Sequence, residues 1–513
     1  MSMDVHHLAG RPVIIGGGIA GLMTALHLAP EPVLLLSRTP LGADASSTWA
    51  QGGLAASLGD DDDPELHLAD TLAAGDGLCD ADAARRVAYA APAAIEDLAR
   101  LGVRFDRTPE GALRLGLEAA HSRRRIVHAG GDGSGREVMR GLVAAVRSTP
   151  TIAVVEGVEA RQLAVEDGSI SGVLASCSTG PVFLATGRVI LATGGIGGLF
   201  DDTTNPLGNC GQGLALAARA GAVLADLEFI QFHPTALDGP GRPMPLISEA
   251  IRGEGATIVD ETGRRFLVGV RGAELAPRDI VARAVWNHLS KGHRAFLDVR
   301  EKPGATFARQ FPTIASACSK AGIDPARDLI PIRPAQHYHM GGIAVDLAGR
   351  TSVPGLWACG EVASTGLHGA NRLASNSLTE AVVCARWVAE SVAASPGGGG
   401  KPAMAPDLPA PDPRPVRPLL SRALGVTRDD AGLKEAARAL LPLAQHHAAA
   451  SDPAAVGLMI TIAALLRQES RGAHFRTDFP HHAAVARRSQ ITLDAALAAA
   501  RELASSPMLE SAL

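Results

Sequence analysis

Two short runs of apolar residues, at positions 12–15 and 33–36, flank a stretch of helical character from Ile19 to about Leu28. Uninterrupted apolar runs of this length are typical of strands that are buried on both faces of a parallel sheet. A helix between two such strands is the usual crossover connection. The pattern therefore predicts a β-α-β unit and an α/β fold at the start of the chain.

The same patterns recur later in the chain, with one interruption. Helical spacing of apolar residues is found at 82–101 and 136–147, and further buried strands are expected at 188–192 and 355–359. Between residues 231 and 339 the pattern changes to short mixed segments. This change predicts an α+β domain inserted into the parallel-sheet domain.

A stretch rich in glycine, proline and alanine, residues 395–418, has little apolar surface to bury and is expected to be a linker. Alanine and leucine at helical spacing follow it and predict a C-terminal helical bundle. The expected organisation is a Rossmann-like domain at 1–230 and 340–394, a capping domain at 231–339, the linker at 395–418 and the helical domain at 419–513.

Composition excludes several kinds of partner and site. The 513 residues carry a formal net charge of −5, which gives no electrostatic reason to expect a nucleic acid. No run approaches the ~18 apolar residues of a membrane helix, and the N-terminus lacks the pattern of a signal peptide. Six dispersed cysteines without a C-x-x-C pair argue against a disulfide framework or a metal cluster. We expect a cytoplasmic protein without nucleic-acid or membrane partners, in which any redox chemistry needs an organic cofactor.

The turn after the first predicted strand, Gly16-Gly17-Gly18-Ile19-Ala20-Gly21, fits G-x-G-x-x-G. In dinucleotide-binding folds the first glycine permits a tight turn, the second lets the backbone approach a pyrophosphate, and the third lets the helix pack closely on the strand. The helix N-terminus supplies N–H donors to the phosphates. Such a turn can also be purely structural, and Ser37 stands where an acidic residue usually follows the second strand.

Two later segments make a flavin the expected dinucleotide. Residues 189–195, and residues 356–361 followed by Asn376-Ser377-Leu378, look like the second and third strand-and-turn segments of two-domain flavoproteins. NAD alone would not require these two segments. We therefore expect FAD as the cofactor.

Seven further segments occur in an order known from one enzyme family: SSTWAQGG (46–53), EFIQFHPTAL (228–237), EAIRGEG (249–255), PRDI (277–280), HYHMGG (337–342), HGANRLASNSL (368–378) and ESRG (469–472). Over nearly its whole length the chain resembles the succinate dehydrogenase/fumarate reductase flavoprotein family. The resemblance implies that FAD contacts Gly16, Gly18, Ile19, Ala20, Gly21, Ser37, Ser46, Ser47, Thr48, Ala50, Gln51, Gly52, Gly53, Gln212, Glu361, Ser377 and Leu378.

Two features choose within this family. Its respiratory members usually carry a histidine just before A-Q-G-G that bonds covalently to the flavin, whereas this chain has Ser46 and Ser47 there. FAD is therefore expected to be non-covalent. The segment EAAHSRRRIVH (118–128) resembles the branch of the family that acts on L-aspartate, in which Glu118 would face the substrate's amino group.

The resemblance implies a site for a four-carbon dicarboxylate. Such a substrate needs at least two fixed cations, because a buried carboxylate without a partner is strongly destabilising, and guanidinium groups pair bidentately with carboxylates. The family pattern also uses an arginine for proton transfer, although the pKa of arginine lies above about 12. It assigns Arg372 and His337 to one carboxylate, His233 with Gln231, Ser248 and Glu249 to the other, Glu118 to the ammonium group and Arg278 to proton transfer.

Each residue also has a structural interpretation when taken alone. His233 beside Pro234 could be a packed loop histidine, and Arg278 with Asp279 could be a surface ion pair, worth only ~0–1 kcal/mol. The basic run 123–125 could be a solvated face, and Glu118 a surface carboxylate. The functional interpretation rests on the motifs occurring together and in family order.

Four positions depart from the family pattern. Gln212 stands where aspartate is usual, which weakens an expected flavin contact, and Ala119-Ala120 replaces a glycine pair, which restricts the backbone. His339 and Ser248 replace threonines. No departure removes a residue with a proposed charged role.

The expected reaction is FAD-dependent oxidation of L-aspartate to iminoaspartate, with oxygen (giving hydrogen peroxide) or fumarate as the acceptor. The resemblance implies the first step of de novo NAD synthesis and a transient transfer of the product to quinolinate synthase. Two alternatives remain open. One is a soluble fumarate reductase or succinate dehydrogenase-type flavoprotein, and the other is a flavin-binding protein without turnover.

Overall fold

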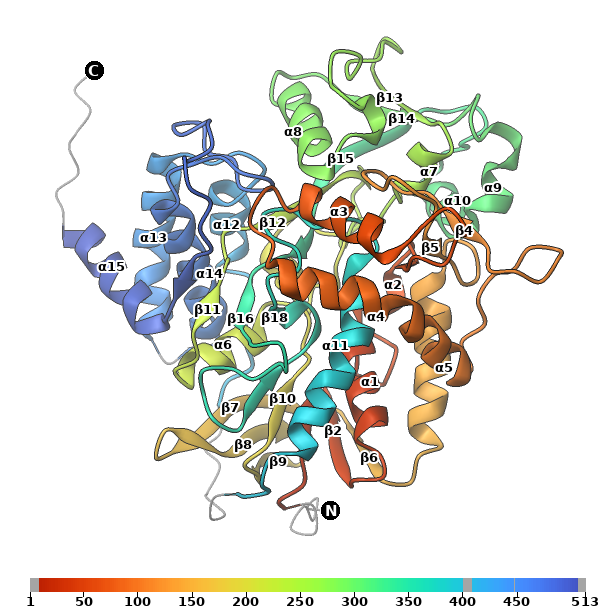
Figure 1. Ribbon diagram of the computed structural model, residues 1–513. Coiled ribbons are helices and arrows are strands. Elements are labelled where there is room, and N and C mark those ends of the chain that lie inside the picture. The colour runs from red at the N-terminus through yellow and green to blue at the C-terminus, as the bar shows by residue number, and fades with distance from the viewer. Residues whose placement is uncertain (1–8, 400–407, 447, 506–513) are drawn as a thin grey trace.

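The computed structural model describes residues 9–399, 408–446 and 448–505. Its central element is a five-stranded sheet in which all neighbouring strands are parallel (Figure 1). The three middle strands are buried along their whole length, as their continuous apolar runs predict. In sheet order the strands are β17 (Leu356–Ala358), β10 (Val189–Leu191), β1 (Val13–Ile15), β2 (Val33–Ser37) and β6 (Ile152–Glu156).

Helices join and cover this sheet. α1 (Ile19–Leu28) connects β1 to β2, which confirms the predicted β-α-β unit. It packs against α11 (Asn376–Ala393) and α5 (Ser134–Arg147), and α11 also packs against α4 (Ala81–Arg100). The predicted helices at 82–101 and 136–147 correspond to α4 and α5, with ends shifted by one or two residues. The other α-helices of this region are α2 (Ser46–Trp49), α3 (Pro64–Ala74) and α6 (Gln212–Arg219).

Three smaller sheets surround the central one. Two of them are antiparallel and lie within the first 190 residues. The third connects distant parts of the chain, because its outer strand comes from the C-terminal region. They consist of β3 (Leu54–Ala55), β5 (Ile126–Val127) and β4 (Leu115–Gly116); of β7 (Glu159–Glu166), β8 (Ser169–Cys177) and β9 (Gly180–Ala185); and of β18 (Ala363–Ser364), β16 (Gly342–Ala344), β11 (Leu224–Ala225) and β19 (Gln490–Ile491).

The region between residues 231 and 339 has an antiparallel sheet and a hydrophobic core of its own, and it lies at the top of Figure 1. This arrangement confirms the inserted α+β capping region, while its boundaries stay a prediction. The sheet order is β12 (Ile230–Leu237), β15 (Ile330–His339), β14 (Ala295–Asp298) and β13 (Thr257–Asp260). The helices are α7 (Ala250–Gly253), α8 (Arg278–Leu289), α9 (Phe307–Gln310) and α10 (Pro312–Lys320).

The C-terminal region is helical, as predicted. α13 (Asp430–Gln445) and α14 (Ser451–Leu466) pack together, with α12 (Arg417–Ala423) and α15 (Leu493–Ser505) beside them. Their apolar side chains share one core with the central sheet, so the bundle is not a separate globule. Within the described ranges, no helix is long and apolar enough to cross a membrane.

The structure describes only part of the predicted linker, residues 395–418. Residues 400–407 lie outside the described residues, and the last two positions of the linker already belong to α12.

Candidate active site and cofactor site

One cavity of about 700 Å³ runs from the glycine-rich turn after β1 to the capping region. Gly16 has φ of +122°, and a Cβ there would overlap the carbonyl of Ala192, the residue after β10, so only glycine fits this turn. A Cβ on Gly21 would collide with the Gly16 carbonyl, so this glycine allows α1 to pack closely on the turn. Of the residues expected to contact FAD, all except Gly21 line the cavity.

The N-terminus of α1 points into the cavity with its donors largely free. The N-cap residue is Gly18, which has no side chain to cap the helix. Among the first amides of α1, only that of Ile19 donates to a side chain, the Ser47 hydroxyl at 3.2 Å. Exposed amides at a helix start attract anions, because the helix dipole is positive there. This part of the cavity is therefore suited to phosphate groups.

Several residues in this part of the cavity were missed by the sequence analysis. Asn205 and Asn209 hold the hydroxyl of Ser46, which donates to the first at 2.8 Å and accepts from the second at 2.7 Å. Glu159 also lines the cavity, directly after Val158, whose amide donates to the Ser37 carbonyl. A carboxylate is thus present near the end of β2, although it comes from another strand. No sequence motif links Asn205, Asn209 and Glu159, so no signal in the sequence points to them.

Gln212 and Glu361 lie in the cavity wall with their side chains partly engaged. The amide group of Gln212 donates to the Gly208 carbonyl and accepts from the Cys210 amide, so it stabilises its own loop. Glu361 accepts from the backbone of His339 at 3.0 Å, and burial raises its pKa to about 7. The side chain of His339 points elsewhere, to the Leu227 carbonyl, and therefore does not contact His337.

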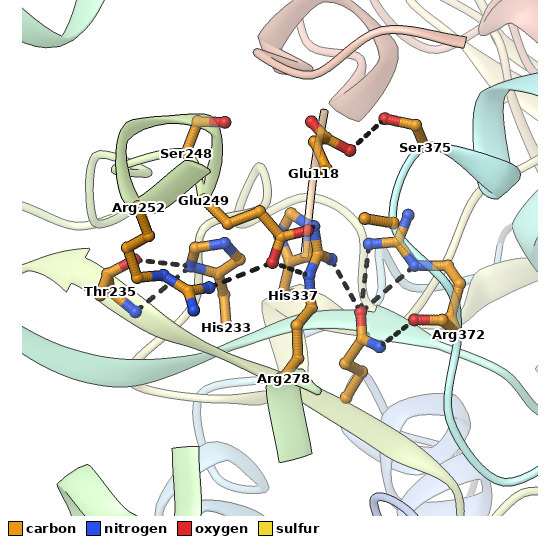
Figure 2. Close-up of polar contacts among 12 residues, drawn as sticks. Glu118, His233, Thr235, Ser248, Glu249, Arg252, Arg278, His337, Arg372 and Ser375 are labelled. Carbon is orange, nitrogen blue, oxygen red and sulfur yellow. Dashed lines mark hydrogen bonds and ion pairs between the residues drawn. The ribbon is translucent and has the colours of Figure 1, made fainter. Parts of the chain in front are cut away.

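At the other end of the cavity, two buried arginines meet around one amide group (Figure 2). Arg278, the first residue of α8, donates to both oxygens of Glu249 at 2.9 and 3.0 Å and to Gln231 Oε1 at 2.9 Å. Arg372 donates to the same Gln231 oxygen at 3.2 and 3.1 Å. Gln231 therefore holds the two guanidinium groups close together despite their like charge.

Arg372 has no carboxylate partner among the described residues. Its remaining hydrogen bond goes to the hydroxyl of Ser377 at 2.5 Å, and its guanidinium carbon lies 4.5 Å from the centre of the Tyr338 ring. Burial lowers the pKa of Arg372 to about 10, with the charge of Arg278 as the next cause. Two of its five N–H donors have no acceptor in this part of the structure, so the site is prepared for an anion.

The predicted site residues divide into two groups. Glu118, His233, Ser248, Arg278, His337 and Arg372 line the cavity, whereas Gln231 and Glu249 lie behind the arginines and do not contribute to its wall. The amide nitrogen of Gln231 is also engaged, donating to Asn371 Oδ1 and to the Arg372 carbonyl. We therefore propose that Gln231 and Glu249 position the arginines instead of touching the substrate.

Arg252 extends the buried ion pair and was missed as a candidate, although it lies three residues after Glu249. It is fully buried, donates to Glu249 Oε2 at 3.1 Å and also bonds the carbonyl of Glu274. Burial raises the pKa of Glu249, but the charges of Arg278 and Arg252 outweigh this effect and keep it below its usual value. The three side chains form a continuous chain of charge-assisted hydrogen bonds leading away from the cavity.

The two histidines pack edge to face, with ring centres 5.1 Å apart. Nδ1 of His233 accepts from the amide of Thr235, so its proton resides on Nε2, a buried atom without a partner in the described structure. Nδ1 of His337 lies 2.8 Å from the hydroxyl of Thr204. Burial and the charge of Arg278 hold both pKa values well below 6.5, which makes both rings neutral donors.

Glu118 is a buried carboxylate with one hydrogen-bond donor, the hydroxyl of Ser375 at 2.6 Å. Burial, followed by the charge of Glu249, raises its pKa to about 7. Ala120, two residues later, has φ of +65°, a backbone conformation that is unfavourable for alanine and favours glycine. The carboxylate lacks a cation at contact distance in the described structure and therefore suits a positively charged group of a ligand.

Comparisons with known proteins agree with this geometry. Residues 11–378 match the family described as FAD binding domain, and residues 449–511 match the fumarate reductase flavoprotein C-terminal family. An L-aspartate oxidase of Mesorhizobium japonicum is 62% identical over 96% of both chains, and one of Agrobacterium fabrum is 56% identical over 97% of this chain and 96% of its own. The chain belongs to the L-aspartate oxidase family.

Solved structures place the L-aspartate oxidase family beside the respiratory flavoproteins. A mutant FrdA of E. coli quinol fumarate reductase superposes with a TM-score of 0.85 at 28% identity, covering 93% of this chain and 92% of its own. Sdh1 of Mycobacterium smegmatis gives a TM-score of 0.79 at 29% identity, covering 92% and 90%. The predicted fold class and family are thereby confirmed.

FAD is the cofactor of this L-aspartate oxidase family member, and the cavity fits it. The glycine turn and the free amides of α1 suit the pyrophosphate, and the cavity continues without interruption to the buried arginines. Gly52 lies between the two ends, where a Cβ would come within 3.0 Å of the Glu118 carboxylate. Residues of the segment 46–53 would therefore hold the flavin end next to the dicarboxylate site.

Acid precipitation of the flavin-loaded protein is expected to release all FAD into the supernatant. The only histidines lining the described cavity are His233 and His337, which belong to the substrate end, and Ser46 and Ser47 occupy the position of the linking histidine. The one cysteine in the wall, Cys359, is a poor nucleophile because burial raises its pKa to about 12. Yellow colour that stays with the precipitated protein would contradict this expectation.

One carboxylate joins the capping region to the FAD-binding region. Asp132, just before α5, accepts from the amides of Thr313 and Ile314 at 3.1 and 3.0 Å, and these are in the first turn of α10. It thus acts as an N-terminal cap across the two regions, although it is distant from α10 in sequence. The contact joins α10 to the segment before α5 at the wall of the cavity, which Asp132 and Thr313 both line.

Replacing Asp132 with alanine is expected to cost about 0.5–2 kcal/mol of stability at this contact, the usual range for a lost cap. Hydrogen–deuterium exchange should then become faster in residues 312–320. Asp63→Ala is the matched control, because Asp63 caps α3 through the Leu66 amide and does not touch the capping region. Unchanged exchange in α10 of the Asp132→Ala protein would rule out the interdomain role.

Proposed function

We propose that this protein oxidises L-aspartate to iminoaspartate, a reaction that removes one hydride and one proton from the substrate's Cα–N unit. The main support for the proposal is that one cavity contains both a cation and a carboxylate that have no oppositely charged partner among the described side chains. Arg372 is a buried cation without a carboxylate, and Glu118 is a buried carboxylate without a cation at contact distance among the described side chains. A molecule with carboxylates and an ammonium group satisfies both.

Five side chains would fix the substrate in one orientation. Arg372 and the neutral ring of His337 would bind one carboxylate, and His233 would donate its free Nε2–H to the other, with the hydroxyl of Ser248 nearby. Glu118 in its ionised form would accept from the ammonium group. Succinate has no group for Glu118, so this carboxylate supports L-aspartate over succinate.

Arg278 is the proposed proton-transfer group. Glu249 holds its guanidinium bidentately, and Gln231 holds the third side, so the group is fixed in the cavity wall. Arg278 can take a proton from the substrate as it passes one of its own to the carboxylate of Glu249, so the guanidinium keeps its charge and Glu249 becomes neutral. Arg252 is already protonated and holds Glu249 in place by its hydrogen bond. The same chain excludes bulk water from the reacting atoms, because all three side chains are buried.

FAD, when bound, supplies the electron acceptor for the substrate and passes the electrons to oxygen, giving hydrogen peroxide, or to fumarate. The product is the first intermediate of de novo NAD biosynthesis, and iminoaspartate would pass to quinolinate synthase. The absence of a membrane-spanning helix in the described residues is compatible with a cytoplasmic location.

The proposal is tested by anaerobic bleaching of the flavin absorbance of the purified protein, with L-aspartate and succinate compared at equal concentrations. Bleaching by L-aspartate, with hydrogen peroxide formed when air is admitted, is the expected result. Bleaching by succinate alone would assign a succinate dehydrogenase-type activity. A yellow protein that responds to neither substrate would leave only a non-catalytic flavin-binding role.

A further inference from the structure

A second group of ligand-type side chains lies on the capping region, away from the cavity. It consists of Glu261, which follows β13, His288 in the last turn of α8, and His293, which precedes β14. One nitrogen or oxygen from each residue lies within 4.8 Å of the other two. The segments that carry them meet at the outer edge of the capping sheet (Figure 1).

The spacing of the donor atoms is close to that of a metal site. Nδ1 of His293 lies 2.9 Å from Glu261 Oε1, and Nε2 of His288 lies 4.0 Å from Glu261 Oε2. Ligand atoms at 2.0–2.2 Å from a tetrahedral ion are separated by roughly 3.3 Å, a value between these two distances. The ring of His293 is 50% exposed, so it can turn to direct Nδ1 toward an ion.

An independent observation concerns the nitrogen of His288. Nε2 is buried and has no hydrogen-bond partner in the described structure, although buried polar atoms are normally satisfied. The ring is held in place by stacking on Phe266, with centres 4.2 Å apart, and on His293 at 4.7 Å. An ion between Nε2 and Glu261 would satisfy this atom.

The charges around the cluster favour a cation. Glu261 supplies a carboxylate, which accepts from the Arg294 amide at 3.0 Å, and the two imidazoles add no permanent positive charge. Asp260 adds negative charge nearby. Arg294 follows His293 in the chain, and its guanidinium lies over the ring of Phe296, 4.9 Å from the ring centre.

We propose that Glu261, His288 and His293 form a binding site for one divalent transition-metal ion of the zinc type. Two imidazoles and one carboxylate suit Zn²⁺, and a water molecule would complete the tetrahedron. The ion would join the end of β13, the end of α8 and the start of β14. α8 begins with Arg278, which lies ten residues, or about 15 Å, from His288 along the helix, so the site is structural and does not touch the substrate.

Calorimetric titration of the flavin-loaded full-length protein with Zn²⁺ tests the proposal, and any affinity tag is removed first because its histidines would bind the ion. One saturable site per chain is expected. His293→Gln and Glu261→Gln should each weaken binding by more than about 10-fold, the lower limit for losing even an outer partner of a metal ligand. His481→Gln removes an exposed histidine elsewhere and should leave binding unchanged.

His288→Gln alone would be ambiguous, because its ring packs on Phe266 and the variant could unfold locally. Electron paramagnetic resonance of the Cu²⁺-loaded wild-type protein provides a second measurement, in which coupling to two imidazole nitrogens is expected. Absence of saturable Zn²⁺ binding, or equal affinity in wild type, His293→Gln and Glu261→Gln, would overturn the site. A signal without nitrogen coupling would do the same.

Discussion

Arg278→Lys is expected to lower the turnover of L-aspartate by about 10²- to 10⁴-fold, the usual range for loss of a proton-transfer group. Lysine keeps the charge and has three donors, but it lacks the planar fork that binds both oxygens of Glu249 and the oxygen of Gln231 at once. The proton-transfer atom would therefore be displaced and unsupported. Steady-state oxidation measured by hydrogen peroxide formation gives the effect directly.

The control for this substitution is Arg283→Lys in the same helix. Arg283 pairs with Asp279 and does not line the cavity, so its replacement should leave turnover nearly unchanged. FAD content is measured in both variants, because Arg278 is placed at the substrate end and its loss should not release the cofactor. Near wild-type turnover of Arg278→Lys would refute the assigned proton-transfer role.

Glu118→Gln is expected to raise the KM for L-aspartate while leaving activity with succinate little changed. Removing one partner of a buried charged pair costs about 2–5 kcal/mol, which corresponds to a factor between about 30 and a few thousand. Glutamine has nearly the same shape and can still contact Ser375, so the effect isolates the charge. Glu110→Gln, at an exposed position of the same region, should have no effect.

The pH dependence provides a further check on Glu118. Its pKa in the ligand-free protein is raised to about 7, and only the ionised form can pair with the substrate's ammonium group. Because kcat/KM reports the ionisation of the free enzyme, kcat/KM for L-aspartate should rise as the pH increases through about 7. This rise should be absent from the pH profile of kcat/KM for Glu118→Gln. An identical profile in the variant would show that another group titrates.

The local patterns of the sequence were sufficient for the framework. Continuous apolar runs predicted β1, β2, β10 and β17 to within one residue at each end, because strands buried on both faces consist almost entirely of apolar residues. The glycine turn after β1 was also readable, since only glycine fits the close approach to Ala192. The motif order then identified the family over nearly the whole chain.

The motifs could not predict which charged side chains pair with each other, because the pairing depends on neighbours that are distant in sequence. The motif EAIRGEG contains Glu249 and Arg252, but only the tertiary structure shows that this pair continues the hydrogen bonds of Arg278. Gln231 was likewise predicted to help bind a substrate carboxylate, but its side chain contacts Arg278 and Arg372 and does not line the cavity.

The sequence by itself determined four strands of the central sheet, the first β-α-β unit, the dinucleotide turn and the identity of the charged residues, because each depends on a few neighbouring positions. Only the tertiary structure decided which of those charges are paired. Arg372 has no carboxylate partner among the described residues and instead binds Gln231, 141 residues away. Asp132 caps α10 through Thr313, 181 residues away. Pairing and burial set the free energy of each charge, and both arise only when such distant segments fold together.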